Sequence, residues 1–394
     1  MSESLVATVG WSTNAEGRDA GADAALIARD RMLRSAPALA LVFASSWLDQ
    51  AATLEGVCSV LGDLPIAGAS TAGEITAEGP ISHSCLVVLL AATSLTCRLG
   101  AAEQADAAPR EAGLQAATAA LKEFREPRAG FLLFGDGLLP RMGDVVRGAQ
   151  EALGTGSLIL GALAGDDLRF ARTYQYAGGR ALTGAVTGIL LGRSAVIGVG
   201  LEHGFSPISR PRRITRAAGH VLFELDGQPA ASVYEEYFGW DHVMRMRRER
   251  FSRQGIAYPL GVRHESGDRW LLRTVVSVGE DGSLGCSGEV HEGDILQLMI
   301  GSREMALDAA RRAALEAVRT LDRVGCVLVF DSAARKTLLG PQQAALEIAR
   351  IREIVGPSTP LAGCYTYGEL AVLGGSGPVA VQTGSVLIVA LGEA

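Results

Sequence analysis

Two segments of eleven residues, 65–75 and 360–370, share a pattern of residue types that could bind a small molecule. Both carry Pro, Ala, Gly, Gly and Glu at matching positions, and the first also offers the hydroxyl groups of Ser70 and Thr71 beside Glu74. Glycines let a backbone approach a ligand closely. A carboxylate can bind an ammonium group, while hydroxyl and N–H groups can bind a carboxylate. The pattern predicts a site for an amino acid or a similar small polar metabolite.

The second segment offers Tyr365, Tyr367 and Glu369 in the corresponding loop. A middle segment, 160–167, has its two glycines one residue closer together and has Asp166 in place of the glutamate. Three related loops are therefore available for one site. Their side chains differ, so a ligand would meet a different set of groups on each loop.

Loops that follow buried strands often carry function, and small-molecule pockets favour the meeting of two domains. We therefore predict that the side chains of the matched loops line a pocket between two domains, bordered by Asp166 or Arg335. A structural interpretation stays open beside this one. The glycines could serve tight turns, and the glutamates could cap an element or pair with arginine. The repetition does not decide between the two, because repeated folds also repeat their turns.

Other chemistries receive less support from the sequence. A hydrolase-type enzyme could use Ser70 or Cys364, but no segment reads G-x-S-x-G and no motif pairs either residue with a His. A single axial His could ligate haem iron, and His220 or His264 could serve, so the cofactor stays unknown with haem as the one named possibility. No His or Cys pair has metal-ligand spacing, and no phosphate-binding loop is present. We expect a binding protein, not an enzyme.

Apolar strands and amphipathic helices must position these loops. Three apolar runs, 41–45, 132–136 and 328–332, contain Phe near their ends and have the length of buried strands. A helix follows, best seen at 341–355, which opens with Pro and stops at Gly-Pro. The glycine-punctuated strand and a closing apolar strand complete each unit. We predict a mixed α/β (α+β) fold in which repeated strand-helix-strand-strand units form mixed sheets.

The length of 394 residues predicts more than one core. A closing strand ends near position 203, and Pro207 begins an irregular segment. We therefore predict one domain at 1–203 and a second at 204–394. Short turns flanked by β-forming residues indicate a β-rich insert at about 255–300 in the second domain.

Composition excludes several classes of partner. A net charge of −7 gives no overall attraction to nucleic acid or to an anionic membrane. The longest apolar stretches fall short of the ~20 residues that a membrane helix needs. Six cysteines without a CxxC pair fit reduced thiols, and the acidic N-terminus lacks a signal-peptide pattern. We expect a cytoplasmic protein that binds neither nucleic acid nor membrane.

Five segments taken together resemble the FIST family, a family of bacterial signalling proteins. They are 68–75, 161–167, 224–230, 329–335 and 363–369, and the resemblance runs from about residue 35 to the C-terminus. It implies an N-terminal and a C-terminal FIST domain that act together as a sensor of a small ligand such as an amino acid. Some members of the family are haem-containing nitric oxide sensors that regulate histidine kinases.

The sequence departs from the family at Ser332, where a Cys is common, and this argues against a function that needs a thiol there. The chain carries no kinase or cyclase signature and no long heptad repeat. The resemblance therefore implies a separate signalling partner, such as a histidine kinase or a chemotaxis component.

Overall fold

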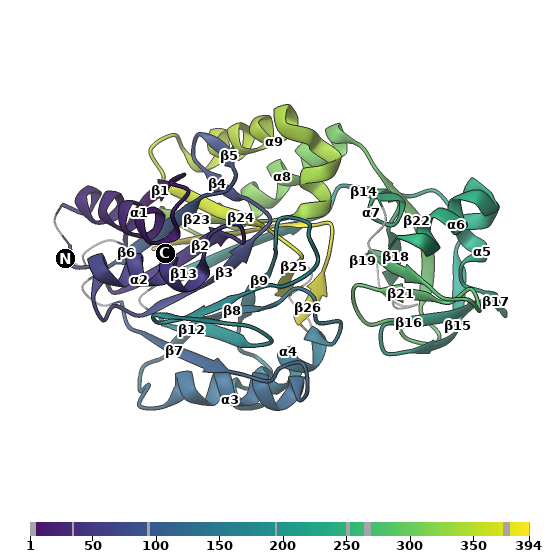
Figure 1. Cartoon of the computed structure of the whole chain (residues 1–394), viewed down its shortest axis with the longest axis horizontal. Coiled ribbons are helices and arrows are strands. Elements are labelled where there is room, and N and C mark those ends of the chain that lie inside the picture. The colour runs from purple at the N-terminus through teal and green to yellow at the C-terminus, as the bar shows by residue number, and fades with distance from the viewer. Residues whose placement is uncertain are drawn as a thin grey trace.

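The computed structural model describes residues 5–33, 35–92, 95–193, 195–249, 253–263, 269–372 and 379–393. Within them, three repeats with the same order of elements follow one another, and a β-rich insert interrupts the third repeat (Figure 1). The predicted mixed α/β fold with repeated units is confirmed. Each repeat is longer than predicted, because a strand and a helix precede the Phe-containing strand and a hairpin precedes the closing strand.

The first repeat consists of β1 (Val6–Ser12), α1 (Gly17–Arg31), β2 (Leu39–Ser45), α2 (Gln50–Leu61), β3 (Ile66–Thr71), β4 (Glu74–Thr76), β5 (Gly79–Ile81) and β6 (Cys85–Ala91). The second consists of β7 (Cys97–Ala102), α3 (Pro109–Leu121), β8 (Arg128–Asp136), α4 (Met142–Leu153), β9 (Ile159–Ala164), β10 (Gln175–Ala177), β11 (Arg180–Leu182) and β12 (Val186–Gly192). The third consists of β13 (Val196–Glu202), α8 (Arg303–Val318), β23 (Arg323–Ser332), α9 (Ala333–Val355), β24 (Leu361–Thr366), β25 (Gly368–Val372), β26 (Val379–Gln382) and β27 (Val386–Glu393). The predicted helix at 341–355 is the main part of α9, and Gly340, with φ of 70°, separates it from the first turns of that helix.

The hairpin of each repeat joins the sheet of another repeat. The sheets have the strand orders β1-β6-β2-β3-β10-β11, β7-β12-β8-β9-β25-β26 and β13-β27-β23-β24-β4-β5. Only the pairs β2–β3, β8–β9 and β23–β24 are parallel among these described strands. The second repeat thus completes the first sheet, the third completes the second, and the first completes the third, which closes the three repeats into a ring.

The register of the parallel pairs explains one glycine in every repeat. Gly68, Gly161 and Gly363 lie opposite the residue that precedes the central Phe of the neighbouring strand. A Cβ at these positions would lie 1.8–1.9 Å from a carbonyl oxygen of that strand. Only glycine permits such a close approach of two backbones. The equivalence of Gly68 and Gly363, which the sequence predicted, is confirmed by this register.

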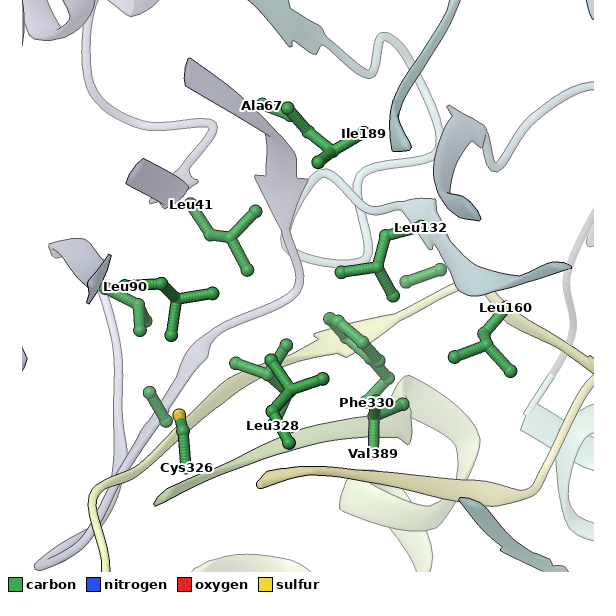
Figure 2. Packing of buried hydrophobic residues seen from close by; sticks show 14 of the residues in the cluster. Leu41, Ala67, Leu90, Leu132, Leu160, Ile189, Cys326, Leu328, Phe330 and Val389 are labelled. Atoms are coloured by element: carbon green, nitrogen blue, oxygen red, sulfur yellow. The ribbon is translucent and has the colours of Figure 1, made fainter. Parts of the chain in front are cut away.

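The main core lies where the three sheets meet. Leu41, Leu132 and Leu328, one from each repeat, point into this common core (Figure 2). Two residues further along the same strands, three phenylalanine rings contact one another edge to face. The centroid distances are 5.8 Å for Phe43–Phe134, 5.8 Å for Phe43–Phe330 and 6.0 Å for Phe134–Phe330. The helices cover the outer faces of the sheets (Figure 1).

The insert occupies positions 205–301, between β13 and α8, and forms a sheet and a core of its own. It consists of β14 (Phe205–Pro207), β15 (Arg212–Ala218), β16 (Val221–Leu225), β17 (Gln228–Pro229), α5 (Ser232–Phe238), α6 (Trp240–Arg248), α7 (Arg253–Ala257), β18 (Leu260–Arg263), β19 (Leu271–Arg273), β20 (Val275–Val278), β21 (Leu284–Cys286) and β22 (Ile295–Gly301). It lies at one side of the ring of repeats (Figure 1).

Polar contacts fasten the insert to the ring. The buried Arg273 donates to the carbonyl oxygen of Val381 at 3.0 Å, and the N–H of Leu272 donates to Oε1 of Gln382 at 3.3 Å. Arg147 of α4 forms an ion pair with Glu289 at 2.6 Å. The described helices include none with the length and hydrophobicity that crossing a bilayer requires.

Candidate functional site

The loops that the sequence selected meet around the axis of the ring. Three backbone hydrogen bonds of 2.8–3.0 Å close a circle there, each running from one repeat to another. They join the N–H of Ala72 to Tyr365, that of Gly165 to Ser70, and that of Tyr367 to Leu163. The three loops therefore lie together, but their backbones bond to one another.

The carboxyl group of Glu74 is completely buried and held by two hydroxyl groups of its own repeat. Thr71 donates to Oε1 and Ser84 donates to Oε2. Burial raises the pKa of Glu74 to about 7, although both hydroxyl donors act in the opposite direction. Burial disfavours the charged form of a carboxyl group, which explains the sign of the shift.

Glu369 has the same environment in the third repeat. Thr366 donates to its Oε1 and Ser385 to its Oε2, and the side chain is fully buried. Burial raises the pKa of Glu369 to about 8. The two predicted glutamates thus face a Thr and a Ser inside the protein, and neither lies on the wall of the main cavity described below.

The second repeat has no carboxyl group at this position, and the prediction that Asp166 replaces the glutamate is wrong. Ala69, Ala162 and Cys364 occupy matching positions, one in each repeat. Cys364 pairs with Glu74 and Ala162 pairs with Glu369, whereas Ala69 pairs with Gln175. The short spacing between the glycines of the second repeat suggested Asp166. The loop between β9 and β10 is longer than its counterparts, so the equivalent position is reached only at Gln175.

Asp166 instead organises the loop that follows β9. Its carboxylate accepts hydrogen bonds from the backbone N–H groups of residues 170, 171 and 172 at 2.7–2.9 Å, and the hydroxyl of Tyr367 also donates to it. Asp167, Leu168 and Phe170 have positive φ angles of 51–61°. Non-glycine residues adopt this region rarely, and such strain concentrates at ligand sites.

Arg335 is fully buried, does not line the cavity described below, and forms two ion pairs. Its guanidinium contacts Asp331, at 2.7 Å, and Glu347, both also fully buried. It donates in addition to the carbonyl oxygens of His203 at 2.8 Å and Ala306 at 3.0 Å. The structural interpretation that the sequence left open fits this residue.

A cavity of about 220 Å³ lies between the second repeat, the third repeat and the insert. Of the predicted site residues only Tyr367 lines it. Its wall is formed by Gly137, Leu138, Leu139, Pro140, Leu163, Leu168, Phe170, His220, Ile256, Thr274, Val276, Ser277, Cys286, Ser287, Ser332, Ala333, Ala334, Thr366, Tyr367 and Thr383. The ring of repeats and the insert both contribute, so the cavity exists only because the two pack together.

Hydroxyl groups and one aromatic pair determine the chemistry of this wall. Phe170 stacks on Tyr367 with centroids 4.9 Å apart and planes inclined by 26°. Besides Tyr367, the hydroxyl-bearing residues are Ser332, Thr366 and Thr383 from the third repeat and Thr274, Ser277 and Ser287 from the insert. Among the lining residues that the structure describes, none is Asp, Glu, Lys or Arg. The cavity therefore suits an uncharged molecule with polar groups and a flat apolar part.

Ser332 is the polar residue at the start of α9. Its Oγ accepts from the N–H of Ala334 at 3.3 Å and from that of Gly384 at 3.0 Å. The hydroxyl proton has no acceptor among the residues that the structure describes. Since a hydroxyl can donate while it accepts, Ser332 can donate one hydrogen bond to a ligand.

Sequence reasoning missed the contribution of the insert. Thr274, Ser277 and Ser287 stand in ordinary hairpin segments, and nothing in their local pattern indicates a site. His220, one of the two named haem-ligand candidates, does line the cavity, whereas His264 lies outside the described residues.

The structure also bears on two other chemistries, a Cys364 nucleophile and a bound metal ion. Cys364 is buried, and burial raises its pKa well above the usual value, which disfavours the reactive thiolate. Across the residues the structure describes, no group of three or more His, Cys, Asp or Glu side chains could hold a metal ion. All six cysteines are free.

Comparison with known protein families gives two matches along the chain. The family model of the FIST N domain matches residues 38–228, and that of the FIST C domain matches residues 230–372. FIST domains are generally associated with small-ligand sensing in signal transduction. No curated protein matches the chain in sequence.

Solved structures with some similarity include two of cyanuric acid hydrolase. The enzyme from A. caulinodans has 10% sequence identity and a TM-score of 0.38, covering 98% of this chain and 99% of that one. The second has 11% identity and a TM-score of 0.35, covering 99% and 100%. T. maritima PurL complexed with FGAR has 10% identity and a TM-score of 0.24, covering 99% and 73%. Similarities this weak do not bear on the function of this chain.

Proposed function

Since the chain belongs to the FIST family, we propose that it is a sensory protein whose small ligand occupies the cavity between the insert and the ring of repeats, and that it signals through a separate partner. The observation that carries the proposal is the composition of the cavity wall. Both parts of the molecule supply hydroxyl groups to it, so a ligand would bridge them.

The ligand that suits this wall is an uncharged polar metabolite. An amino acid carries an ammonium group and a carboxylate, and burying either one without a partner of opposite charge is costly. The carboxylates that could bind an ammonium, Glu74 and Glu369, are enclosed by their own Thr and Ser partners. A planar, apolar part of the ligand would lie against the Phe170–Tyr367 pair.

Bridging provides a means of signalling. A ligand that contacts both Ser277 of the insert and Thr366 of the third repeat stabilises the arrangement in which these parts are together. A ligand shifts a conformational equilibrium by the difference of its affinities for the two states. A partner such as a histidine kinase or a chemotaxis component would then distinguish the bound from the free arrangement, in the cytoplasm.

Binding without catalysis is part of this proposal. The Oγ of Ser332 is held by two N–H donors, and the buried Cys364 disfavours a thiolate. Haem, the alternative ligand, would require His220 as an axial ligand. A cavity of about 220 Å³ is smaller than even the ~300–1,000 Å³ of pockets for drug-sized ligands, so it does not fit a haem group as it stands.

Native mass spectrometry of freshly purified protein tests the proposal. We expect an added mass of a small uncharged molecule in the wild type. Ala334→Leu places a larger side chain at the cavity wall and should abolish the added mass. Ala119→Leu on the exposed face of α3 is the matched control and should retain it. An added mass that both variants retain would place the ligand elsewhere, and a Soret absorption band would establish haem instead.

A further inference from the structure

A second cavity, of about 190 Å³, lies elsewhere along the interface between the insert and the third repeat. It is lined by Leu201, Glu202, His203, Arg269, Trp270, Gln382 and Ser385. The segment 382–385 contributes to both cavities, since Thr383 belongs to the wall of the first. Unlike the described wall of the first cavity, this one includes the charged side chains Glu202 and Arg269.

His203 presents an N–H donor here. Its Nδ1 accepts a hydrogen bond from the backbone N–H of Phe205 at 3.0 Å, so the neutral ring carries its proton on Nε2. Burial, together with the nearby charges of Arg335, Arg312 and Arg269, lowers the pKa of His203 to about 4. The ring is therefore neutral at pH 7.

Gln382 contributes a second donor. Its Oε1 accepts from the N–H of Leu272, which fixes the orientation of the amide. The Nε2 group is buried and has no hydrogen-bond partner among the described residues. Buried polar groups are nearly always paired, and an unpaired donor at a cavity wall indicates a missing acceptor.

The remaining polar groups on this wall are one cation without an ion pair among the described residues and two side chains that have partners. The exposed Arg269 has no ion pair with any residue that the structure describes. Glu202 is paired with Arg312 at 3.1 Å, and the hydroxyl of Ser385 donates to Glu369. The groups that have no partner among the described residues are thus donors, and the indole of Trp270 adds a flat apolar surface beside them.

We propose that this second cavity binds a small organic carboxylate, with the N–H groups of His203, Gln382 and Arg269 as donors to its oxygen atoms and Trp270 against its apolar part. Charge-assisted hydrogen bonds of this kind are the stronger ones, and a guanidinium matches the geometry of a carboxylate. The site is separate from the uncharged cavity and does not depend on the role proposed for that cavity.

Titration with sodium propionate tests the site, with propionamide as the neutral probe of the same shape and sodium chloride to match ionic strength. The readout is the indole N–H signal of Trp270 in an NMR spectrum of the full chain, assigned among the four tryptophans by Trp270→Phe. We expect a saturable shift with propionate and none with propionamide. Equal shifts with both probes, or no saturation with propionate, would overturn the proposal.

Two variants locate the binding. Gln382→Glu keeps the acceptor for Leu272 but replaces the free donor with a negative oxygen, and should abolish the saturable shift. Arg269→Gln changes an exposed side chain, so it should fold normally and bind propionate about tenfold more weakly. Exposed Gln342→Glu and Arg125→Gln are charge-matched controls that should bind as the wild type does. Wild-type affinity in folded Arg269→Gln would show that the anion binds elsewhere.

Discussion

Glu74 and Glu369 occupy equivalent positions in the first and third repeats, and each accepts hydrogen bonds from one threonine and one serine. Both are fully buried, and in the second repeat an amide, Gln175, stands in their place. The protein therefore already shows that a neutral side chain can fill this position, and the protonated form of each glutamate resembles that neutral state.

The first prediction follows from these carboxyl groups. In the folded state burial raises their pKa values to about 7 and about 8, from 4.5. Between 4.5 and 8 the folded state binds more protons than the unfolded state, so the free energy of unfolding falls as the pH rises. Glu369→Gln removes one titrating group and should reduce this fall by an amount on the order of 3 kcal/mol.

Urea denaturation at pH 5 and pH 8.5 measures the effect. The exposed Glu78→Gln is the control and should show the same fall as the wild type. A fall of the same size in Glu369→Gln would mean that this carboxyl group does not titrate differently in the folded state.

The second prediction concerns the buried ion cluster of Arg335. Two carboxyl groups, Asp331 and Glu347, contact one guanidinium, and burial raises the pKa of both. Arg335→Ala would leave them buried without a cation and should cost about 3–5 kcal/mol of stability. Glu347→Gln keeps the shape and is neutral, as the protonated carboxyl group is, so it should cost much less.

Arg110→Ala provides the comparison, because its ion pair with Glu151 is on the surface. Exposed pairs contribute about 0–1 kcal/mol. Chemical denaturation at pH 7 measures the free energy of unfolding of each variant. Similar losses of stability in Arg335→Ala and Arg110→Ala would contradict the cost assigned to the buried, unpaired carboxyl groups.

The third prediction concerns the three phenylalanines at the centre of the ring. Each ring contacts the other two edge to face. Phe330→Ala should destabilise the protein by about 3–5 kcal/mol. Phe330→Leu and Phe43→Leu made together should deviate from the sum of the single changes by about 0.5–1.5 kcal/mol, because contacting aromatic pairs are coupled. Additive losses in a double-mutant cycle would show that the rings act independently.

The fourth prediction uses the close approach of two backbones. A Cβ at Gly363 would lie 1.8 Å from the carbonyl oxygen of Val329, so Gly363→Ala should prevent the parallel pairing of β23 and β24 and yield no soluble folded protein. Gly156→Ala meets no atom within 4 Å and should change stability by less than about 0.5 kcal/mol. A folded Gly363→Ala protein with wild-type circular dichroism would contradict this reason for the glycine.

The repeated strands could be predicted from the sequence, but the strands with which they pair in the sheets could not. Apolar runs such as 328–332 are periodic and local, so the strand and the helix after it could be predicted. The hairpin β4–β5 pairs with β24, far away in sequence, and such pairing depends on contacts that no local pattern contains. The predicted boundary at 203 places β13 at the end of the first domain, whereas this strand opens the third repeat, because its pairing with β27 is equally distant in sequence.

The candidate site shows the same limit. Similar loops indicated where the repeats converge, and Tyr367 does line the main cavity. The glutamates were chosen for their charge, yet burial beside Thr and Ser gives them a role inside the repeats. The insert residues that complete the wall, such as Thr274, are brought there by packing between two bodies, which the sequence does not reveal.

The exchange of hairpins has a consequence for the chain as it leaves the ribosome. The β4–β5 hairpin is made early, but its pairing partner β24 follows only after the second repeat and the whole insert. Until then the first repeat has an unpaired hairpin, and the third sheet has no edge to receive it. We expect nascent chains that end before β24 to expose this hairpin to chaperones, since the ring can close only when its last repeat has emerged.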